Sequence, residues 1–150
     1  MKKILVSACL CGKPCRYDGR SKPCTEPVFL KWREEGRLIP VCPEVMGGLP
    51  VPRPPCQRRG DGVFTEAGES RTAEYLLGAD KALETARKQD VACCILKEYS
   101  PSCGVHRIYD GTFSGKKISG EGLAAQLLRE NGYAVFSEEE LSSAEEFLKT

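Results

Sequence analysis

The sequence predicts a single α/β domain over residues 1–150, with three layers and a mainly parallel, Rossmann-like sheet. The chain has 150 residues, of which 41% are hydrophobic, and this size suits one domain with one core. Short β-branched runs are apolar almost without interruption, which is typical of strands buried on both faces of a parallel sheet. Segments with helical periodicity separate these runs, so strands and helices alternate along the chain.

The predicted strands are the four apolar runs at residues 3–8, 38–42, 91–96 and 133–136. The third run contains Cys93 and Cys94, and we expect both thiols to lie in the core, because a strand of this kind is buried on both faces. Parallel strands deliver the residues that follow them to one edge of the sheet, where open α/β sheets bind their ligands. We therefore expect the functional site at the carboxyl ends of the strands.

Two helices are predicted in the first half of the chain. The first is capped by Thr25, has Pro27 in its first turn and stops at Gly36. The second has the strongest helical period and covers about residues 72–88. We expect its buried face to consist of Leu76, Leu77, Leu83 and Ala86.

Two further helices are predicted in the second half. One covers about residues 121–130, and its inward face consists of Leu123, Leu127 and Leu128. A capping box at residues 137–140 opens the last helix, which extends through Leu148. The proline-rich residues 43–59 are predicted to form a long ordered loop, and residues 60–68 a turn or hairpin on the surface.

Charge and hydropathy exclude several functional classes. The 22 Lys and Arg residues nearly balance the 21 Asp and Glu residues, so no bulk charge favours nucleic acid or an anionic membrane. No apolar run approaches the roughly 18 residues that span a bilayer. The first residues resemble a lipoprotein signal, but the apolar stretch at residues 4–8 is shorter than the roughly 7–15 residues that such a signal needs. We therefore expect a cytoplasmic protein.

Cysteine is the most informative residue type in this chain. There are nine cysteines, an odd number, and the chain is not a small secreted one, so a disulfide scaffold is not expected. In a reducing compartment such cysteines bind metal, react or fill the core. Cys11 and Cys15 form a C-x-C-x3-C pattern with Cys9, which matches neither zinc ribbons nor bacterial ferredoxins. Cys24 and Cys56 are expected to be surface or packing residues.

Three other cysteines follow strands. Cys9 comes directly after the first predicted strand, Cys42 ends the second, and Cys103 lies in the loop after the third. Because the carboxyl ends of parallel strands share one edge of the sheet, these cysteines should meet there. Three thiolates at one edge of a sheet can hold a metal centre.

Polar residues accompany these cysteines. Glu44 lies two residues after Cys42, where it could transfer protons at a metal-bound substrate, although a solvated loop acid is the alternative. Ser100 and Ser102 precede the third cysteine and could bind a polar edge of a substrate, or simply stabilise the turn. The single histidine, His106, is interpreted as structural.

A series of short motifs runs through nearly the whole chain. They are Ser7-Ala-Cys-Leu10, Arg16-Tyr-Asp-Gly19, Cys42-Pro-Glu44, Gly47-Gly-Leu-Pro50, Pro52-Arg53, Leu96-Lys97, Ser100-Pro-Ser-Cys-Gly104, Leu77-Gly-Ala79, Tyr109-Asp-Gly-Thr-Phe-Ser-Gly115 and Gly122-Leu-Ala-Ala125. In their order and number these motifs resemble the thiouracil desulfidase family of small bacterial and archaeal proteins. At Cys11 and Cys15 the chain departs from the family pattern, in which Leu and Val are frequent.

The resemblance implies a [4Fe–4S] cluster held by Cys9, Cys42 and Cys103, with one iron left open. It further implies a non-redox desulfidase, in which the open iron accepts the sulfur of a thiolated pyrimidine and a C=S bond becomes C=O with release of sulfide. The residues that match the catalytic pair of the family are Glu44, which would shuttle protons, and Ser100, which would orient the ring or the water.

Two alternatives stay open from the sequence. The cysteines could hold zinc or cycle through disulfides, which would make the protein a metal or redox module without turnover. The same cluster could also act on another sulfur-bearing substrate, including a thiolated nucleoside of RNA. The balanced charge argues against intact nucleic acid, although Arg53, Arg58 and Arg59 could form a local basic patch. A small thiolated pyrimidine or nucleoside is the expected substrate.

Overall fold

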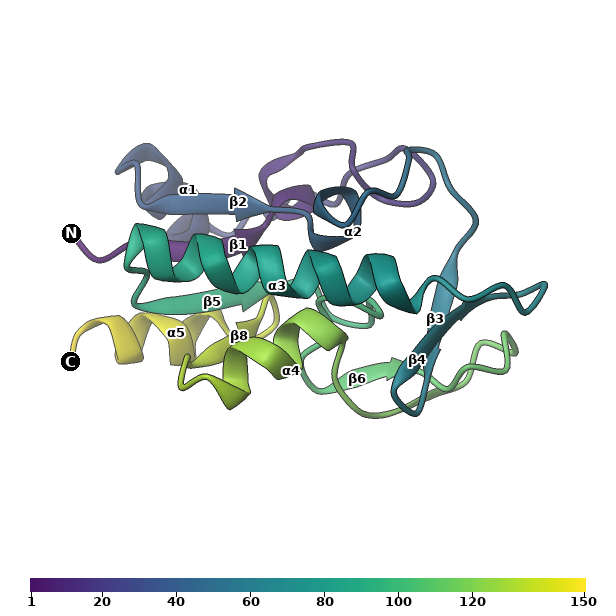
Figure 1. Ribbon diagram of the computed structural model, residues 1–150. Helices are drawn as coiled ribbons and strands as arrows, with labels where there is room; N and C mark the ends of the chain where they lie inside the picture. The colour runs from purple at the N-terminus through teal and green to yellow at the C-terminus, as the bar shows by residue number, and fades with distance from the viewer.

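The computed structural model describes residues 1–150 and has three layers, with a sheet between two layers of helices (Figure 1). Four strands form the sheet in the order β2-β1-β5-β8, and all of its neighbouring pairs are parallel. The strands are Ile4–Ser7 (β1), Leu38–Val41 (β2), Cys93–Leu96 (β5) and Val135–Ser137 (β8). The predicted three-layer α/β class is confirmed, and each strand overlaps its predicted run.

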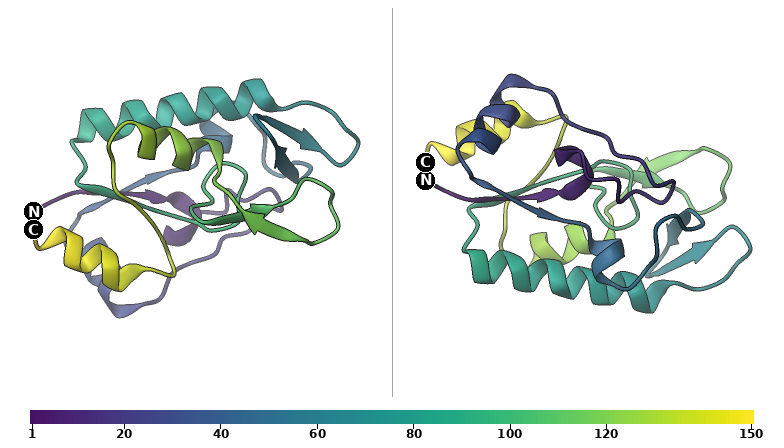
Figure 2. Two further views of the ribbon diagram at one scale, coloured as in Figure 1. Left: turned by 90° about the horizontal axis from the view of Figure 1, so that it is seen from below. Right: turned by 90° about the horizontal axis from the view of Figure 1, so that it is seen from above.

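Helices cover both faces of the sheet (Figure 2). The helices are Pro27–Glu34 (α1), Thr72–Gln89 (α3), Leu123–Glu130 (α4) and Leu141–Leu148 (α5). Leu5 and Cys94 pack in the core between the sheet and α3 with α4, whereas Ile4, Val6 and Cys93 pack toward α1 and α5. Successive strand residues point to opposite faces, so a strand that is buried on both sides must be apolar throughout. Cys93 and Cys94 are therefore core residues, as predicted.

Helix α3 spans the predicted segment, and half of its predicted inward face is confirmed, because Leu83 and Ala86 are buried whereas Leu76 and Leu77 are not. Leu76 and Leu77 are 49% and 46% exposed. The residues that α3 buries are Tyr75, Gly78, Ala79, Ala82, Leu83 and Ala86. A Cβ atom on Gly78 would collide with the backbone carbonyl of Pro43 in the short helix α2 (Pro43–Met46). Close approach of two backbones, which needs small residues, therefore outweighs the hydrophobicity of the leucines.

The predicted helix ends shift by a few residues. Glu26, and not Thr25, is the N-cap of α1. The backbone N–H of Ser137 donates to Glu140 Oε1 at 2.9 Å and that of Glu139 donates to Ser137 Oγ at 3.1 Å, so the capping contacts form in the turn before α5. Residues 121–122 precede α4 instead of belonging to it. None of the helices combines the length and the apolar character that crossing a membrane requires.

The segments outside the main sheet contain more structure than the sequence predicts. The predicted loop at residues 43–59 begins with α2 and ends with β3 (Cys56–Arg59), so the loop prediction is wrong at both ends. Strand β3 pairs with β4 (Gly62–Thr65) in a hairpin, so a hairpin is present as predicted, but it begins four residues before the predicted segment 60–68. A second hairpin, β6 (Arg107–Tyr109) with β7 (Lys117–Ser119), was not predicted. These strands have three or four residues and are largely polar, so their sequences lack a strand period.

Candidate active site

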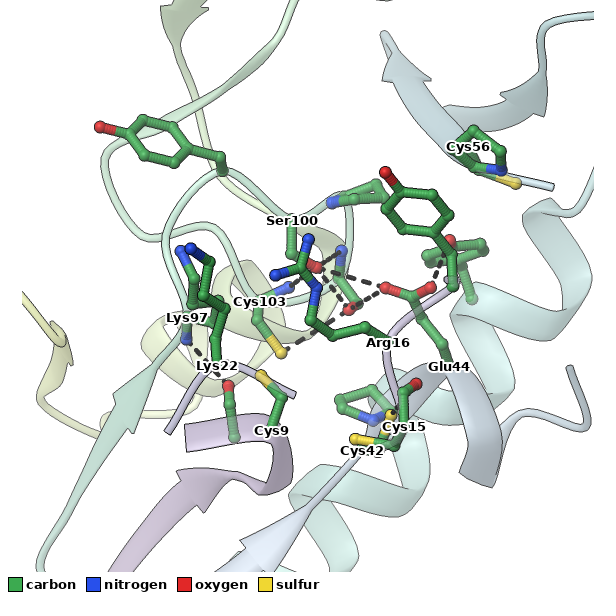
Figure 3. Close-up of a pocket in the computed structure, with 18 of the residues that line it drawn as sticks. Cys9, Cys15, Arg16, Lys22, Cys42, Glu44, Cys56, Lys97, Ser100 and Cys103 are labelled. Carbon is green, nitrogen blue, oxygen red and sulfur yellow. Dashed lines mark hydrogen bonds between the residues drawn. The ribbon is translucent and has the colours of Figure 1, made fainter. Parts of the chain in front are cut away.

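The carboxyl ends of the strands open into a pocket of about 540 Å³ (Figure 3). Strand β1 lies between β2 and β5. The chain passes from β1 to β2 on one side of β1 and later continues with β5 on the other side. A crevice forms at the carboxyl ends of the strands where the strand order reverses in this way. Cys9 reaches the pocket from the short 3-10 helix η1 (Ala8–Cys11) that directly follows β1. Cys42 enters as the N-cap of α2, and Cys103 from the loop after β5. The structure therefore brings the three strand-end cysteines to one pocket.

These thiols differ in their electrostatic surroundings. Cys9 and Cys103 are buried, with 8% and 5% of their surface exposed. Burial, followed by the charge of Cys42, raises the pKa of Cys9 to about 11. Burial likewise raises the pKa of Cys103 to about 12. Cys42 is half-buried, its Sγ lies 3.7 Å from the backbone carbonyl of Cys15, and the neighbouring Cys15 side chain lowers its pKa. The site thus combines one thiol whose pKa is lowered with two whose burial a bound cation would have to compensate.

The donor set fits a multi-iron cluster. All nine cysteines are free thiols, so no disulfide competes for them. Thiolates at the walls of a pocket are the ligands that iron–sulfur clusters use. Cys9, Cys42 and Cys103 line the pocket and could hold such a group, and Cys15 lines the same pocket.

Glu44 is the centre of a hydrogen-bond network beside these thiols. Its Oε1 accepts hydrogen bonds from Arg53 Nε at 3.1 Å and from the Tyr75 hydroxyl at 2.9 Å, and it pairs with Arg53 Nη2 at 3.0 Å. Its Oε2 accepts hydrogen bonds from Ser100 Oγ at 3.3 Å and Ser102 Oγ at 3.0 Å. Glu44 is therefore a fixed carboxylate, and not the solvated loop acid that the sequence left open.

The two serines link this carboxylate to a thiol. Their hydroxyl oxygens are 2.9 Å apart, and Ser102 Oγ lies 3.6 Å from Cys103 Sγ. Ser100 Oγ also accepts the backbone N–H groups of Ser102 and Cys103, each at 3.1 Å. Ser100 thus shapes the loop while Ser102 bridges Glu44 to the thiol. The structure brings both hydroxyls to Glu44, so both belong to the site.

Glu98 organises the loop that carries the serines and Cys103. Its Oε1 accepts the backbone N–H groups of Val105, His106 and Arg107 at 2.7, 2.9 and 3.0 Å. Burial disfavours the charge of Glu98, but these hydrogen bonds outweigh it and lower its pKa below the usual value. A buried carboxylate at the base of the loop therefore closes residues 98–107 into a ring.

The remaining sequence-derived candidates lie apart from this centre or at its border. His106 Nε2 lies 2.6 Å from Glu140 Oε1 and lines no part of the pocket, in agreement with a structural role. Cys11 and Cys24 pack beside the core under α1 and α5. Cys15 does line the pocket, so the C-x-C-x3-C pattern is divided between pocket and core. Cys56 is buried, as a packing residue should be, and also reaches the pocket wall.

Tyr75 and Glu98 are the functional residues that the sequence did not reveal. Tyr75 lies 31 residues from Glu44, on a different helix, so no local spacing connects them. Arg53 lies only nine residues after Glu44, in the motif Pro52-Arg53. The sequence alone suggests a basic patch at this position and not a partner for Glu44. Its side chain is only 4% exposed, and the Glu44 carboxylate balances its charge. A cation in an otherwise apolar, proline-rich stretch was the available signal for a buried ion pair.

The wall of the pocket is partly aromatic and cationic. Tyr17, Tyr99, Tyr109 and Phe113 line the pocket, together with Arg16, Lys22 and Lys97. The ammonium of Lys117 lies 4.0 Å from the centre of the Tyr99 ring, which holds the ring at the pocket wall. Aromatic faces with a few polar groups are typical of pockets that bind planar, polar rings.

Comparison with known proteins agrees with this architecture. A protein of Bacillus subtilis (strain 168), named uncharacterized protein YbbK, is 44% identical over 149 residues, which cover 93% of this chain and 97% of that protein. A solved structure of the [4Fe–4S]-dependent thiouracil desulfidase TudS is 48% identical and superimposes with a TM-score of 0.98, over 99% of both chains. The family described as 2-thiouracil desulfurase matches residues 4–140. The chain therefore belongs to the 2-thiouracil desulfurase family.

Proposed function

We propose that this protein is a [4Fe–4S]-dependent desulfidase that converts the C=S group of a thiolated pyrimidine into C=O and releases sulfide. The observation that carries the proposal is the pocket itself, in which three strand-end thiols face a carboxylate that two hydroxyls contact. Family membership and the similarity to TudS support the same activity. The aromatic side chains that line the pocket suit a planar pyrimidine ring.

In this proposal Cys9, Cys42 and Cys103 hold the cluster through their thiolates. A cluster with one iron free of cysteine supplies a Lewis acid that attracts soft sulfur and makes the attached carbon more electrophilic. The overall change is C=S plus H₂O to C=O plus H₂S, which needs no net electron transfer. No external oxidant or reductant is therefore required.

The residues of the chain supply the acid–base chemistry. Glu44 Oε2 takes a proton from the water that adds to the thiocarbonyl carbon and returns it to the departing sulfur. Ser100 and Ser102 donate hydrogen bonds at this oxygen, and their hydroxyls can turn to orient the water or the ring. Arg53, buried against the other carboxylate oxygen, holds that oxygen in place through its ion pair with Glu44.

The proposal is tested by anaerobic reconstitution with iron and sulfide, followed by incubation with 2-thiouracil. We expect a brown protein with about four irons per chain, because Cys-ligated [4Fe–4S] clusters have that content. We also expect one uracil and one sulfide for each thiouracil consumed. A colourless protein that binds one zinc and releases no sulfide would support the metal-module alternative instead.

The ligand assignment has its own test. Replacement of Cys9, Cys42 or Cys103 by Ala should abolish both colour and bound iron after reconstitution. Cys24→Ala is the matched control, because Cys24 is a half-buried thiol outside the pocket and its loss should leave the iron content unchanged. Loss of iron in Cys15→Ala, but not in Cys103→Ala, would contradict the assignment.

A further inference from the structure

Helices α2 and α3 are in backbone contact beside the pocket. A Cβ atom on Gly47 would collide with the carbonyl of Glu74, and one on Gly78 with the carbonyl of Pro43. Two glycines, one on each side, therefore allow the helices to lie closer than side chains would permit. This contact sets the position of α2, and hence of Glu44, relative to α3.

Tyr75 lies one helical turn before Gly78 on α3. Because the two helices lie so close together, its side chain reaches Glu44 on α2. Only 1% of Tyr75 is exposed, and its ring packs with Leu49, Val63 and Leu123 in a small apolar cluster. Its hydroxyl donates to Glu44 Oε1 at 2.9 Å. Burial strongly raises the pKa of Tyr75, so the hydroxyl stays protonated and remains a donor.

The contacts of Glu44 divide its carboxylate into two halves. The donors to Oε1, from Arg53 and Tyr75, are side chains with less than a tenth of their surface exposed. The donors to Oε2 are the hydroxyls of Ser100 and Ser102, which can rotate and exchange partners. Oε1 is therefore held by two buried side chains from other elements, and Oε2 faces the serines of the loop that carries Cys103.

The geometry points to Tyr75 as a positioning residue that fixes the Glu44 carboxylate with Oε2 toward the serines. This inference rests on the proposed function, because it assigns how the proton-transfer group of that reaction is held. Arg53 reaches Oε1 from the loop after α2, and both of its contacts go to this one oxygen. The Tyr75 hydroxyl reaches the same oxygen from α3, so Oε1 is held from two separate elements while Oε2 is left to the serines.

The deciding variant is Tyr75→Phe, which keeps the ring and its packing and removes only the hydroxyl. We expect unchanged iron content and KM for 2-thiouracil, with kcat lowered by about 10-fold to 100-fold, the usual cost of a misplaced catalytic group. A crystal structure of the variant should show the Glu44 carboxylate rotated, with its contacts to Ser100 and Ser102 lost. The orientation of the carboxylate in the crystal does not depend on turnover. An inactive wild-type protein would therefore refute the proposed function, while the crystal structure of Tyr75→Phe would still test the role of Tyr75.

Val63→Ala is the matched control, because Val63 is fully buried in the same apolar cluster and donates nothing to Glu44. It should lower the melting temperature while kcat stays at the wild-type value. An unchanged Glu44 carboxylate in Tyr75→Phe would overturn the inference, whatever happens to turnover. Wild-type kcat with a rotated carboxylate would overturn it as well, as would an equal loss of kcat in Val63→Ala.

Discussion

At the scale of single residues, the site depends on which group holds a proton and which group holds a metal. Glu44 lies two residues from Cys42, yet its hydrogen bonds all go to Arg53, Tyr75 and the two serines. No hydrogen bond joins its carboxylate directly to a thiol, and the link to Cys103 runs through Ser102. The proposed mechanism therefore assigns ligation and proton transfer to different side chains, so one should be removable without the other.

Glu44→Gln tests this separation. Gln has the same shape but cannot accept the proton, so the cluster should assemble with normal iron content and thiouracil should still bind. Sulfide release should fall by about 10²–10⁴-fold, the usual contribution of a positioned general acid or base. Near-normal release with intact iron would transfer the role to the serines or to water, whereas lost iron would make Glu44 structural.

At the scale of elements, two contacts set the geometry of the site: the docking of α2 on α3, and the loop from Glu98 to Arg107. Gly78 allows the first, because any side chain there would meet the carbonyl of Pro43. Glu98 closes the second through hydrogen bonds to backbone N–H groups. Both contacts support the elements that carry the pocket residues, so their loss should change the stability of the fold as well as activity.

Gly78→Ala should destabilise the protein, by about 1–3 kcal/mol, as an overpacked contact does. The sign is the informative part, because Gly→Ala within a helix stabilises by roughly 0.5–1 kcal/mol where space is free. Urea unfolding measures the change, and Leu77→Ala serves as the control, since Leu77 is 46% exposed on the same helix. A stabilised Gly78→Ala variant would show that α2 can move away from α3 at no cost.

Glu98 predicts a pH dependence of stability. Its pKa in the folded chain lies below the ordinary value of 4.5, so its charge stabilises the fold at neutral pH. This contribution is complete above pH 4.5 and is lost as the pH falls through the folded-state pKa. Glu98→Gln should therefore be less stable than wild type at pH 7, and the difference should shrink in acid. Glu66→Gln, at an exposed position, should show no such difference at either pH.

At the scale of the whole molecule, the pocket joins segments that are far apart in the chain. Cys9, Cys42 and Cys103 follow three neighbouring strands, so a group bound to all three thiols would link β2, β1 and β5 at their carboxyl ends. A ligand that binds only the folded chain shifts the folding equilibrium toward it. Cluster binding and global stability should consequently be coupled.

Reconstitution should therefore raise the melting temperature of the protein under anaerobic conditions. Treatment with an iron chelator should reverse the gain, and Cys103→Ala should show no gain at all. The comparison of apo and reconstituted forms by differential scanning calorimetry is the direct measurement. An equal melting temperature for both forms, with iron bound, would mean that the thiols hold the cluster without linking the strands.

The sequence by itself determined the class of fold and the meeting place of the cysteines. Continuous apolar runs such as residues 3–8 can be accommodated only where both faces of a strand are buried, and parallel strands end at a common edge. Only the tertiary structure revealed that α3 buries Gly78 instead of Leu77, that β6 and β7 form a hairpin, and which residues contact Glu44. Gly78 is buried instead of Leu77 because the backbone of α2 at Pro43 packs directly against it. Tyr75 contacts Glu44 only because α2, which carries Glu44, packs against α3 at this point. Periodicity reports how apolar a face is, whereas close approach and hydrogen bonding depend on which distant segment packs against it.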